Sequence, residues 1–444
     1  MSSASGPNSS GILSETEAEA SVVPAITPAA PPAALDARHR ATHIFRVFRH
    51  RNYRLYFIGM LVSLVGSWMQ SVAQGWLVYD LTGSPLLLGV TAFAGQIPLF
   101  FGSPFGGAIA DRADKRLVLF FTQGGSMVLA VILAALTLMH VVVVWHVIVL
   151  AFLLGLVNAV DVPTRQSFII DMVGREDLRS AIALNSIMFN IARVIGPSIA
   201  GLVVALVGEG ICFAFNAVSY AAVLASLFLM EVTKHKPKLH ESPWHEMKLG
   251  FRYVRGHPQI RTVLWLIGAA SFFGGPYLSL MPVFAKDVLG QGSEGLGFLM
   301  AAIGIGALLG AYTVSVIPDR LVAFMPVVAA ALFGVGLIAF SQSHIFWLSL
   351  LLVVPTAFSL MLQGSATNAL IQHISQEHMR GRVLSFYSLA FLGMLPWGSL
   401  LIGWLSDHYN VQLAVSFGGA ACIVCAGVAY WTRHLLPREF AEIK

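Results

Sequence analysis

The residues of this chain that could do chemistry are charged side chains inside long apolar stretches. Arg193, Asp161 and Asp80 each lie within, or at the end of, such a stretch. A charge near the middle of a bilayer costs about 3 kcal/mol on insertion scales, so each should face a cavity or a partner. The chemistry open to them is ion pairing, binding of an anionic or electron-rich ligand, and proton transfer.

Three interpretations of Arg193 are open. It could form a structural ion pair, for which Asp161 is the nearest acid, although Asp161 lies about 10 Å nearer the cytoplasmic end. It could anchor an anionic or electron-rich substrate. It could also belong to a proton-coupling site, in which case a carboxylate must titrate because arginine keeps its proton. Asp161 is the best-placed acid for that role and Asp80 the second, unless Asp80 simply ends its helix.

Uncharged amides lie at similar depth. Gln70 and Gln74 are four residues apart and share a helix face, and Asn190 lies near Arg193 in the sequence. Because unpaired amides are unfavourable in lipid, each should either bridge two helices or face a central cavity. The aromatic and methionine residues that would line this cavity are Trp68, Met69, Trp76 and Phe189. The pattern predicts a polar, nearly uncharged cavity that suits a bulky amphiphilic molecule.

A short charged loop follows Gly106 and Gly107 and joins two apolar stretches. Its charged residues are Asp111, Arg112, Asp114, Lys115 and Arg116. The loop could be a solvated turn. Alternatively it could act as a latch, because Asp111 lies close to the start of the next helix, where an anion is favoured.

A glycine–proline pair, Gly196 and Pro197, lies in the same apolar stretch as Arg193. Proline removes one backbone hydrogen bond, and glycine allows a neighbouring helix to approach closely. The pair could be an ordinary kink or could shape a gate, and Gly201 permits similar close packing. Pro396 predicts a second bend late in the chain.

Composition places these residues in lipid. The 444 residues are 57% hydrophobic and 11% charged, whereas a soluble domain carries about 25% charged residues. The chain contains no Walker sequence, no metalloprotease or nucleophile motif, and no His/Cys cluster with metal spacing. We therefore expect no enzyme, no metal and no cofactor, and we assign the three cysteines to core packing. Positive-inside topology explains the net charge of +5 better than nucleic-acid binding does.

Stretches long enough to cross a membrane as helices occur twelve times, which predicts an all-α membrane protein. All but two of the 27 Lys and Arg residues lie on one side of these stretches, the exceptions being Arg193 and Lys286. Because Lys and Arg favour the cytoplasm, both termini are predicted to be cytoplasmic, in a bacterial inner membrane. The predicted spans are 55–79, 86–110, 117–139, 143–167, 180–206, 211–231, 262–285, 295–317, 324–341, 345–371, 383–405 and 412–432.

The spans form two groups of six. We predict a disordered cytoplasmic tail at 1–42, a first bundle at 43–231, a cytoplasmic connection at 232–260, a second bundle at 261–434 and a tail at 435–444. The connection is basic, and Trp244, Met247, Phe251 and Val254 predict one face of a surface helix. Internal echoes favour a duplicated unit: Glu176 to Arg179 precedes span five, and Glu377 to Arg380 precedes span eleven.

These features resemble the major facilitator superfamily, which has two six-helix bundles and a loop motif of the form G-x-L-A-D-R-x-G-R-K. Asp114 replaces the usual Gly, and the chain is similar to the transmembrane secretion effector branch, which includes enterobactin exporters and macrolide efflux proteins. Gly196 to Gly201 is similar to the G-P-x-x-G-G motif of drug/proton antiporters, with Ala200 as the departure. The residues that match the loop motif are Gly107, Ile109, Asp111, Arg112, Lys115 and Arg116.

The resemblance implies secondary active transport. We expect proton-driven export of a bulky drug-like or siderophore-like molecule by alternating access, by a monomer in the bilayer. It also implies that Asp111 pairs across the two bundles in the outward-facing state. An uptake symporter and a lysophospholipid flippase are alternatives on the same fold. A non-transporting receptor would need a large soluble domain, and a channel would need a filter-like loop or a charged ring.

Overall fold

The computed structural model describes residues 45–231 and 243–431. The two predicted tails, 1–42 and 435–444, and most of the first part of the central connection lie outside the described residues. The described residues from Arg46 onward form one compact unit, and the description below concerns this unit alone.

Helices account for nearly all of the described residues, and twelve segments match the twelve predicted spans. Eleven helices are long and apolar enough to cross a membrane, and Met325–Ser341 is a shorter apolar helix at the predicted ninth span. The first half of the unit contains η1 (Arg46–Arg49), α2 (Arg51–Thr82), α3 (Pro85–Arg112), α4 (Lys115–Leu138), α5 (Val144–Val173), α6 (Leu178–Val207) and α7 (Glu209–Leu229).

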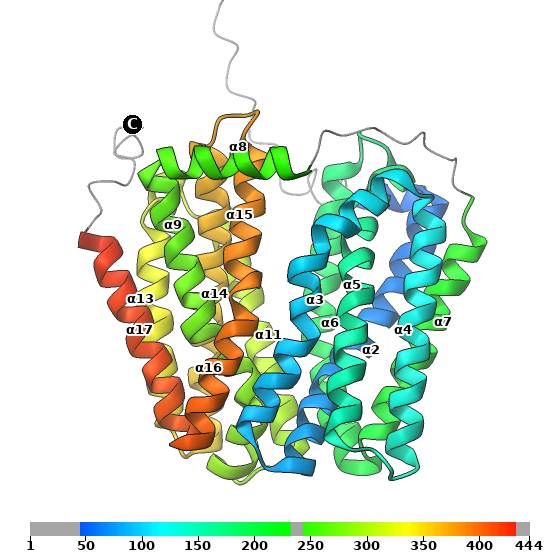
Figure 1. Cartoon of the computed structure of the whole chain (residues 1–444), viewed down its shortest axis with the longest axis vertical. Helices are drawn as coiled ribbons and strands as arrows, with labels where there is room; N and C mark the ends of the chain where they lie inside the picture. The colour runs from blue at the N-terminus through cyan, green and yellow to red at the C-terminus, as the bar shows by residue number, and fades with distance from the viewer. Residues whose placement is uncertain (1–44, 232–242, 432–444) are drawn as a thin grey trace, which may run out of the picture. The chain divides into compact units, whose positions relative to one another are not determined.

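The second half begins with a helix that lies crosswise to the others, α8 (Figure 1). Its seventh span is a series of short pieces, whereas the remaining spans are mostly continuous. The elements are α8 (Pro243–Gly256), α9 (Pro258–Ala269), η2 (Ala270–Gly274), η3 (Gly275–Leu280), α10 (Met281–Val283), η4 (Phe284–Val288), α11 (Ser293–Val316), α12 (Asp319–Val322), α13 (Met325–Ser341), α14 (Phe346–Ile374), α15 (Arg380–Gly393), α16 (Leu395–His408) and α17 (Val411–Trp431).

The connections between spans are short and carry helix-ending signals. α2 ends at Gly83, whose φ of 59° lies in the left-handed region that glycine adopts easily. Ser84 then caps α3 by accepting a hydrogen bond from the backbone N–H of Leu87, and Pro85 occupies the first turn. Such short connections make consecutive spans antiparallel.

Helix pairs recur in the two halves. In the first half, α3 packs on α5, and α4 packs on α5 and α7; in the second, α11 packs on α14, and α13 packs on α14 and α17. The two halves meet where α6 packs on α11 and where α3 packs on α16. These contacts join span five to span eight and span two to span eleven, as expected for a duplicated six-helix unit.

Irregular backbone is concentrated in two spans of the second half. The seventh span passes from α-helix through π-helical and 3-10 segments around Pro276 and Pro282. The eleventh breaks between α15 and α16, beside Pro396, where a bend is predicted. By contrast, α6 runs as one helix through Pro197. The predicted bend motif therefore does not interrupt its own helix.

Two faces of the unit are distinguished below. The loop face contains the α3–α4 connection, α8 and the connection between α14 and α15. The opposite face contains the α2–α3 connection, the α16–α17 connection and the link from η4 to α11. In Figure 1 the loop face is at the top.

Candidate functional site

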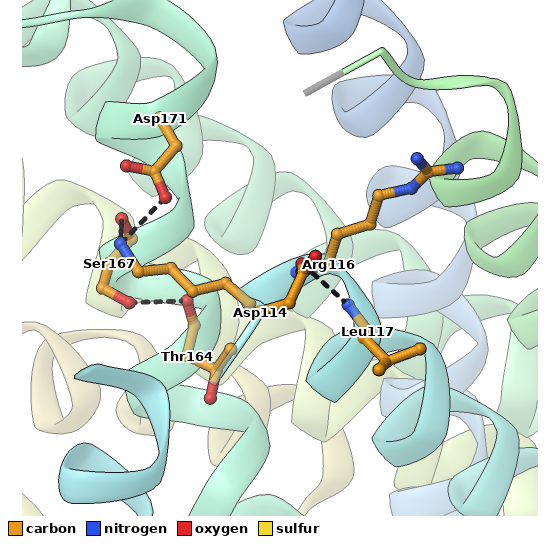
Figure 2. Close-up of polar contacts among 7 residues, drawn as sticks. Asp114, Arg116, Leu117, Thr164, Ser167 and Asp171 are labelled. Carbon is orange, nitrogen blue, oxygen red and sulfur yellow. Dashed lines mark hydrogen bonds and ion pairs between the residues drawn. The ribbon is translucent and has the colours of Figure 1, made fainter. Parts of the chain in front are cut away.

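The charged loop anchors the start of α4 within its own half (Figure 2). Lys115 Nζ lies 2.8 Å from the Asp171 carboxylate and donates to the Ser167 carbonyl at 3.1 Å, both on α5. Asp171 is almost fully buried, so this ion pair is well shielded from water. Arg116 donates to the carbonyls of Leu227 and Phe228, which end α7.

Asp114, the residue that departs from the superfamily motif, is the N-cap of α4. Its carboxylate accepts hydrogen bonds from the backbone N–H groups of Arg116 at 3.0 Å and Leu117 at 3.4 Å (Figure 2). Glycine lacks a side-chain acceptor, so Asp114 adds a cap that the usual residue cannot supply.

The rest of the motif faces outward. Asp111 and Arg112 occupy the last turn of α3 and are exposed. A Cβ on Gly107 would meet no atom within 4 Å, whereas one on Gly106 would lie 2.0 Å from the Ala159 carbonyl oxygen of α5. Gly106 therefore supports close packing within the half, and Gly107 lies beside open space.

Asp161 pairs with a residue other than Arg193. Its buried carboxylate lies 3.1 Å from Arg165, one turn along the same helix. Thr122 and Gln123 of α4 each donate to it at 2.8 Å. Arg165 lies within α5, which continues to Val173, beyond its predicted end. Of the three interpretations of Arg193, the ion pair with Asp161 is therefore not formed in this state.

Arg193 lies instead among aromatic side chains. Its guanidinium carbon is 5.7 Å from the centre of the Trp68 ring, which makes an edge contact with Phe189 at the same centroid distance. Tyr277 of the other half lies near enough to influence the Arg193 charge. Tyr277 is fully buried, and its hydroxyl has no hydrogen-bond partner in the described part of the chain. We call Arg193, Trp68, Phe189 and Tyr277 the Arg193 cluster.

A cavity of about 140 Å³ lies nearer the opposite face, between α2, α3 and the broken seventh span. Of the three predicted amides, Gln74 lines it. Gln70 instead accepts a hydrogen bond from Asn216 of α7 at 2.7 Å, and Asn190 donates to the Ser186 carbonyl of its own helix. The polar residues that line the cavity are Ser71, Gln74, Thr91 and Ser279.

Polar contacts join the two halves at the opposite face. Lys286 donates to Asp80 at 2.6 Å, and the adjacent Tyr79 hydroxyl donates to Asp287. Ser84 donates to Asp407 of α16 at 2.8 Å. Asp80 therefore has an ionic partner as well as lying near its helix end.

Close helix packing continues these contacts to about the middle of the spans. A Cβ on Gly201 would lie 2.8 Å from the Gly297 Cα, and one on Gly304 would lie 3.1 Å from the Arg193 carbonyl oxygen. One and two turns further along that face of α11, Leu308 and Tyr312 are exposed. The halves thus touch from the opposite face to mid-span and diverge toward the loop face.

Sequence reasoning missed several of these residues. Three of them lie in the broken seventh span: Tyr277, Ser279 and Asp287. Their hydroxyls and carboxylate stand beside glycine and proline and form no sequence motif that indicates a site. Lys286 carried a usable signal, since it is the single cation predicted on its side of the membrane. A lone cation at the end of an apolar span should pair with an acid at the same depth, such as Asp80.

The comparison with known families decides the classification. Residues 42–442 match the model of the transmembrane secretion effector family. The chain belongs to this family. Its members are transporters of the major facilitator superfamily, so this protein is a multi-pass membrane transporter that handles a small molecule.

Among curated proteins, this transporter is similar to the staphyloferrin A transporter of Staphylococcus aureus, with 27% identity over 88% of this chain and 98% of that protein. It is 26% identical to the multidrug efflux pump Tap of Mycolicibacterium fortuitum, over 80% of this chain and 88% of the pump. It is 25% identical to the enterobactin exporter EntS of Shigella boydii, over 60% of this chain and 63% of the exporter.

Solved structures confirm the fold. A bacterial homologue of the human lysosomal transporter Spinster, in an inward-facing and unoccupied conformation, superimposes with a TM-score of 0.71. The superposition covers 88% of this chain and 98% of the homologue at 14% identity. A D-xylose-proton symporter gives a TM-score of 0.64, over 86% of this chain and 98% of the symporter, also at 14% identity.

Proposed function

We propose that this transporter exports a bulky organic molecule, of drug or siderophore type, in exchange for protons. The observation that carries the proposal is the asymmetric contact between its halves. Polar pairs and close-packed glycines hold the opposite face together, while the halves diverge toward the loop face around the Arg193 cluster. The relatives named for siderophore and drug export favour the same direction.

The distribution of Lys and Arg residues indicates which face of the transporter is cytoplasmic. They gather on the loop face, and this distribution supports a cytoplasmic loop face, with both termini on the cytoplasmic side of a bacterial inner membrane. The state described here then presents its central residues to the cytoplasm, as loading for export requires. Closing the loop face and parting the opposite face would release the substrate outside. A monomer with bundles at 43–231 and 261–434 is sufficient for this cycle.

The Arg193 cluster is the proposed substrate anchor. A guanidinium beside an indole ring offers both charge and a flat apolar surface to an anionic or electron-rich aromatic molecule. The buried Tyr277 hydroxyl can donate a hydrogen bond to a ligand. A buried donor without an acceptor is energetically costly, so a ligand that accepts this hydrogen bond would bind more tightly. Gly196 lets Trp68 pack against α6, and Gln74 is a further candidate substrate contact in the cavity nearer the opposite face.

Asp161 is the proposed proton site. Its carboxylate holds Arg165 and two side chains of α4, so protonation would leave Arg165 without its charge partner. Breaking a buried pair costs several kcal/mol, which is sufficient to favour a different packing of α4 against α5. Asp80 is exposed and paired with Lys286, and we assign it to closure of the opposite face.

The test measures accumulation of fluorescent drugs and labelled siderophores in cells that lack their own exporters. Expression should lower accumulation, and a protonophore should restore it. Arg193→Gln should raise the half-saturating substrate concentration about tenfold, the effect of losing one hydrogen bond to a charged group. Asp161→Asn should abolish uphill export but preserve exchange of substrate across the membrane.

Glu176→Gln, which removes an exposed carboxylate on the loop face, is the matched control and should export normally. Higher accumulation in expressing cells would show uptake in place of export. Export that persists in protonophore would contradict proton coupling.

A further inference from the structure

A basic and apolar groove lies outside the transport pathway, between α8 and α15 on the loop face. It has a volume of about 430 Å³. We call it the α8 groove. Its lining residues are Met247, Lys248, Phe251, Arg252, Arg255 and Phe386.

α8 is fixed to the second half along one side. Gly250 lies against α15, because a Cβ there would be 2.9 Å from the Phe386 ring and 3.2 Å from the Arg382 Cβ. Tyr253 and Val254 pack on the buried cluster that contains Ile260 and Leu370. These contacts fix the position of α8, so the groove beside it is a defined feature of the surface.

The other side of α8 combines charge with exposed apolar surface. Lys248, Arg252 and Arg255 follow one another at helical spacing on one face, and Arg252 and Arg255 are exposed. Phe251 is 58% exposed, and its ring lies 6.4 Å from the ring of Phe386. Among the residues described as lining the groove, none is acidic. Such a surface fits a molecule that has a phosphate at one end and an apolar chain at the other.

The position of the groove relative to the membrane distinguishes a phospholipid from a soluble phosphate as the ligand. Phe386 lies about 9 Å along α15 from Arg380, at 1.5 Å per residue, so the groove extends from the polar boundary toward the hydrocarbon. A soluble anion would neutralise the arginines but leave the phenyl rings in contact with water. A phospholipid satisfies both parts of the groove.

We propose that one anionic phospholipid of the leaflet at the loop face binds in the α8 groove. Its phosphate lies between Arg252 and Arg255, with Lys248 at the rim, and an acyl chain covers Phe251 and Phe386. The lipid ties the connection between the halves to α15, which continues into the α16 helix that contacts α3. The site is independent of the transported substrate and of the direction of transport.

Native mass spectrometry of the full-length protein with equimolar phosphatidylglycerol and phosphatidylethanolamine, matched in acyl chains, tests the site. The wild type should retain one phosphatidylglycerol under conditions that remove phosphatidylethanolamine. R252Q/R255Q should weaken phosphatidylglycerol binding about 30-fold, at the usual contribution of a basic residue near an anionic surface. R54Q/R175Q, which removes two exposed cations elsewhere on the loop face, should change it less than about twofold.

Three outcomes would overturn the proposal. Equal retention of both lipids by the wild type would remove headgroup selectivity. An equal loss in both double variants would reduce the effect to general surface charge. Displacement of the lipid by glycerol 3-phosphate at a similar concentration would make the groove a site for soluble anions. Phe386→Ala adds an independent measurement, because it should weaken lipid binding without touching a charge.

Discussion

Lys286 and Asp80 form an ion pair of 2.6 Å that joins the seventh span to the first at the opposite face. The two residues lie 206 positions apart, one in each half of the chain. Lys286 also lies 5.9 Å from the ring of Trp76, so its ammonium has an aromatic neighbour as well as an acidic one. Because closure of this face defines the present state, the pair should influence how often the transporter opens outward.

Removing the pair should shift the transporter toward the outward-open state. Both side chains are about half exposed, so the pair contributes only about 0.5–1 kcal/mol, and Asp80→Asn should raise outward opening roughly two- to fivefold. The rate at which an external thiol reagent labels a cysteine placed at Ser279, in the cavity, measures this opening. The charge exchange Asp80→Lys with Lys286→Asp should restore the wild-type rate; continued opening in that variant would contradict the role of the pair.

Bulk at the α6–α11 crossing should prevent this closure. Gly201→Val places a side chain where Gly297 Cα lies 2.8 Å away, and overpacking of this kind costs about 1–3 kcal/mol. We expect a lower melting temperature and loss of transport. Gly124→Ala is the control, because its new methyl group meets no atom within 4 Å and should leave both quantities unchanged.

Substitution of Asp114 should reveal how much the N-cap of α4 contributes to the stability of the protein. Asp114→Ala should destabilise the protein by about 1 kcal/mol, while Asp114→Asn should retain most of the cap. Asp114→Gly, the usual residue of the superfamily motif, should cost only a few tenths of that amount. Thermal unfolding in detergent ranks the three variants by stability. Equal stability of the Ala and Asn variants would show that the cap contributes nothing.

Asp111 provides a test of the predicted latch on the loop face. It is exposed in this state, so Asp111→Asn should leave folding and membrane insertion unchanged. If Asp111 pairs across the halves in the outward-facing state, the loss of about 1 kcal/mol should slow transport roughly fivefold. Protein abundance in the membrane and initial export rate are measured together. A normal rate at normal abundance would make the loop a solvated turn.

Asp177 should link stability to pH at the junction between η1 and α6. A hydrogen bond from His50, together with the charges of Arg49 and Arg46, holds the pKa of Asp177 below its usual value despite its burial. A lowered pKa stabilises the fold above the ordinary aspartate pKa, and this contribution is lost as the pH falls below about 4. The gap in melting temperature between wild type and Asp177→Asn should persist from about pH 8 to 5 and shrink below about 4. A constant gap would contradict the linkage.

The sequence alone determined the number and placement of the spans, because membrane-length apolar runs and short polar connections admit few arrangements. Even the ninth span, Met325–Ser341, and the break beside Pro396 follow from local pattern. The loop motif and the internal echoes also indicated the superfamily and a duplicated unit. These properties depend on residues that are close together in the sequence.

Only the tertiary structure decided which polar residues meet. Depth in the membrane suggested Asp161 as the partner of Arg193. In the structure Asp161 pairs with Arg165 of its own helix and accepts hydrogen bonds from α4, while Arg193 lies beside Trp68. Gln70 and Gln74 share a helix face by spacing, yet the first bonds to α7 and the second lines the cavity. Partner choice depends on the rotation and packing of helices from both halves, and neither quantity is encoded in any single apolar run.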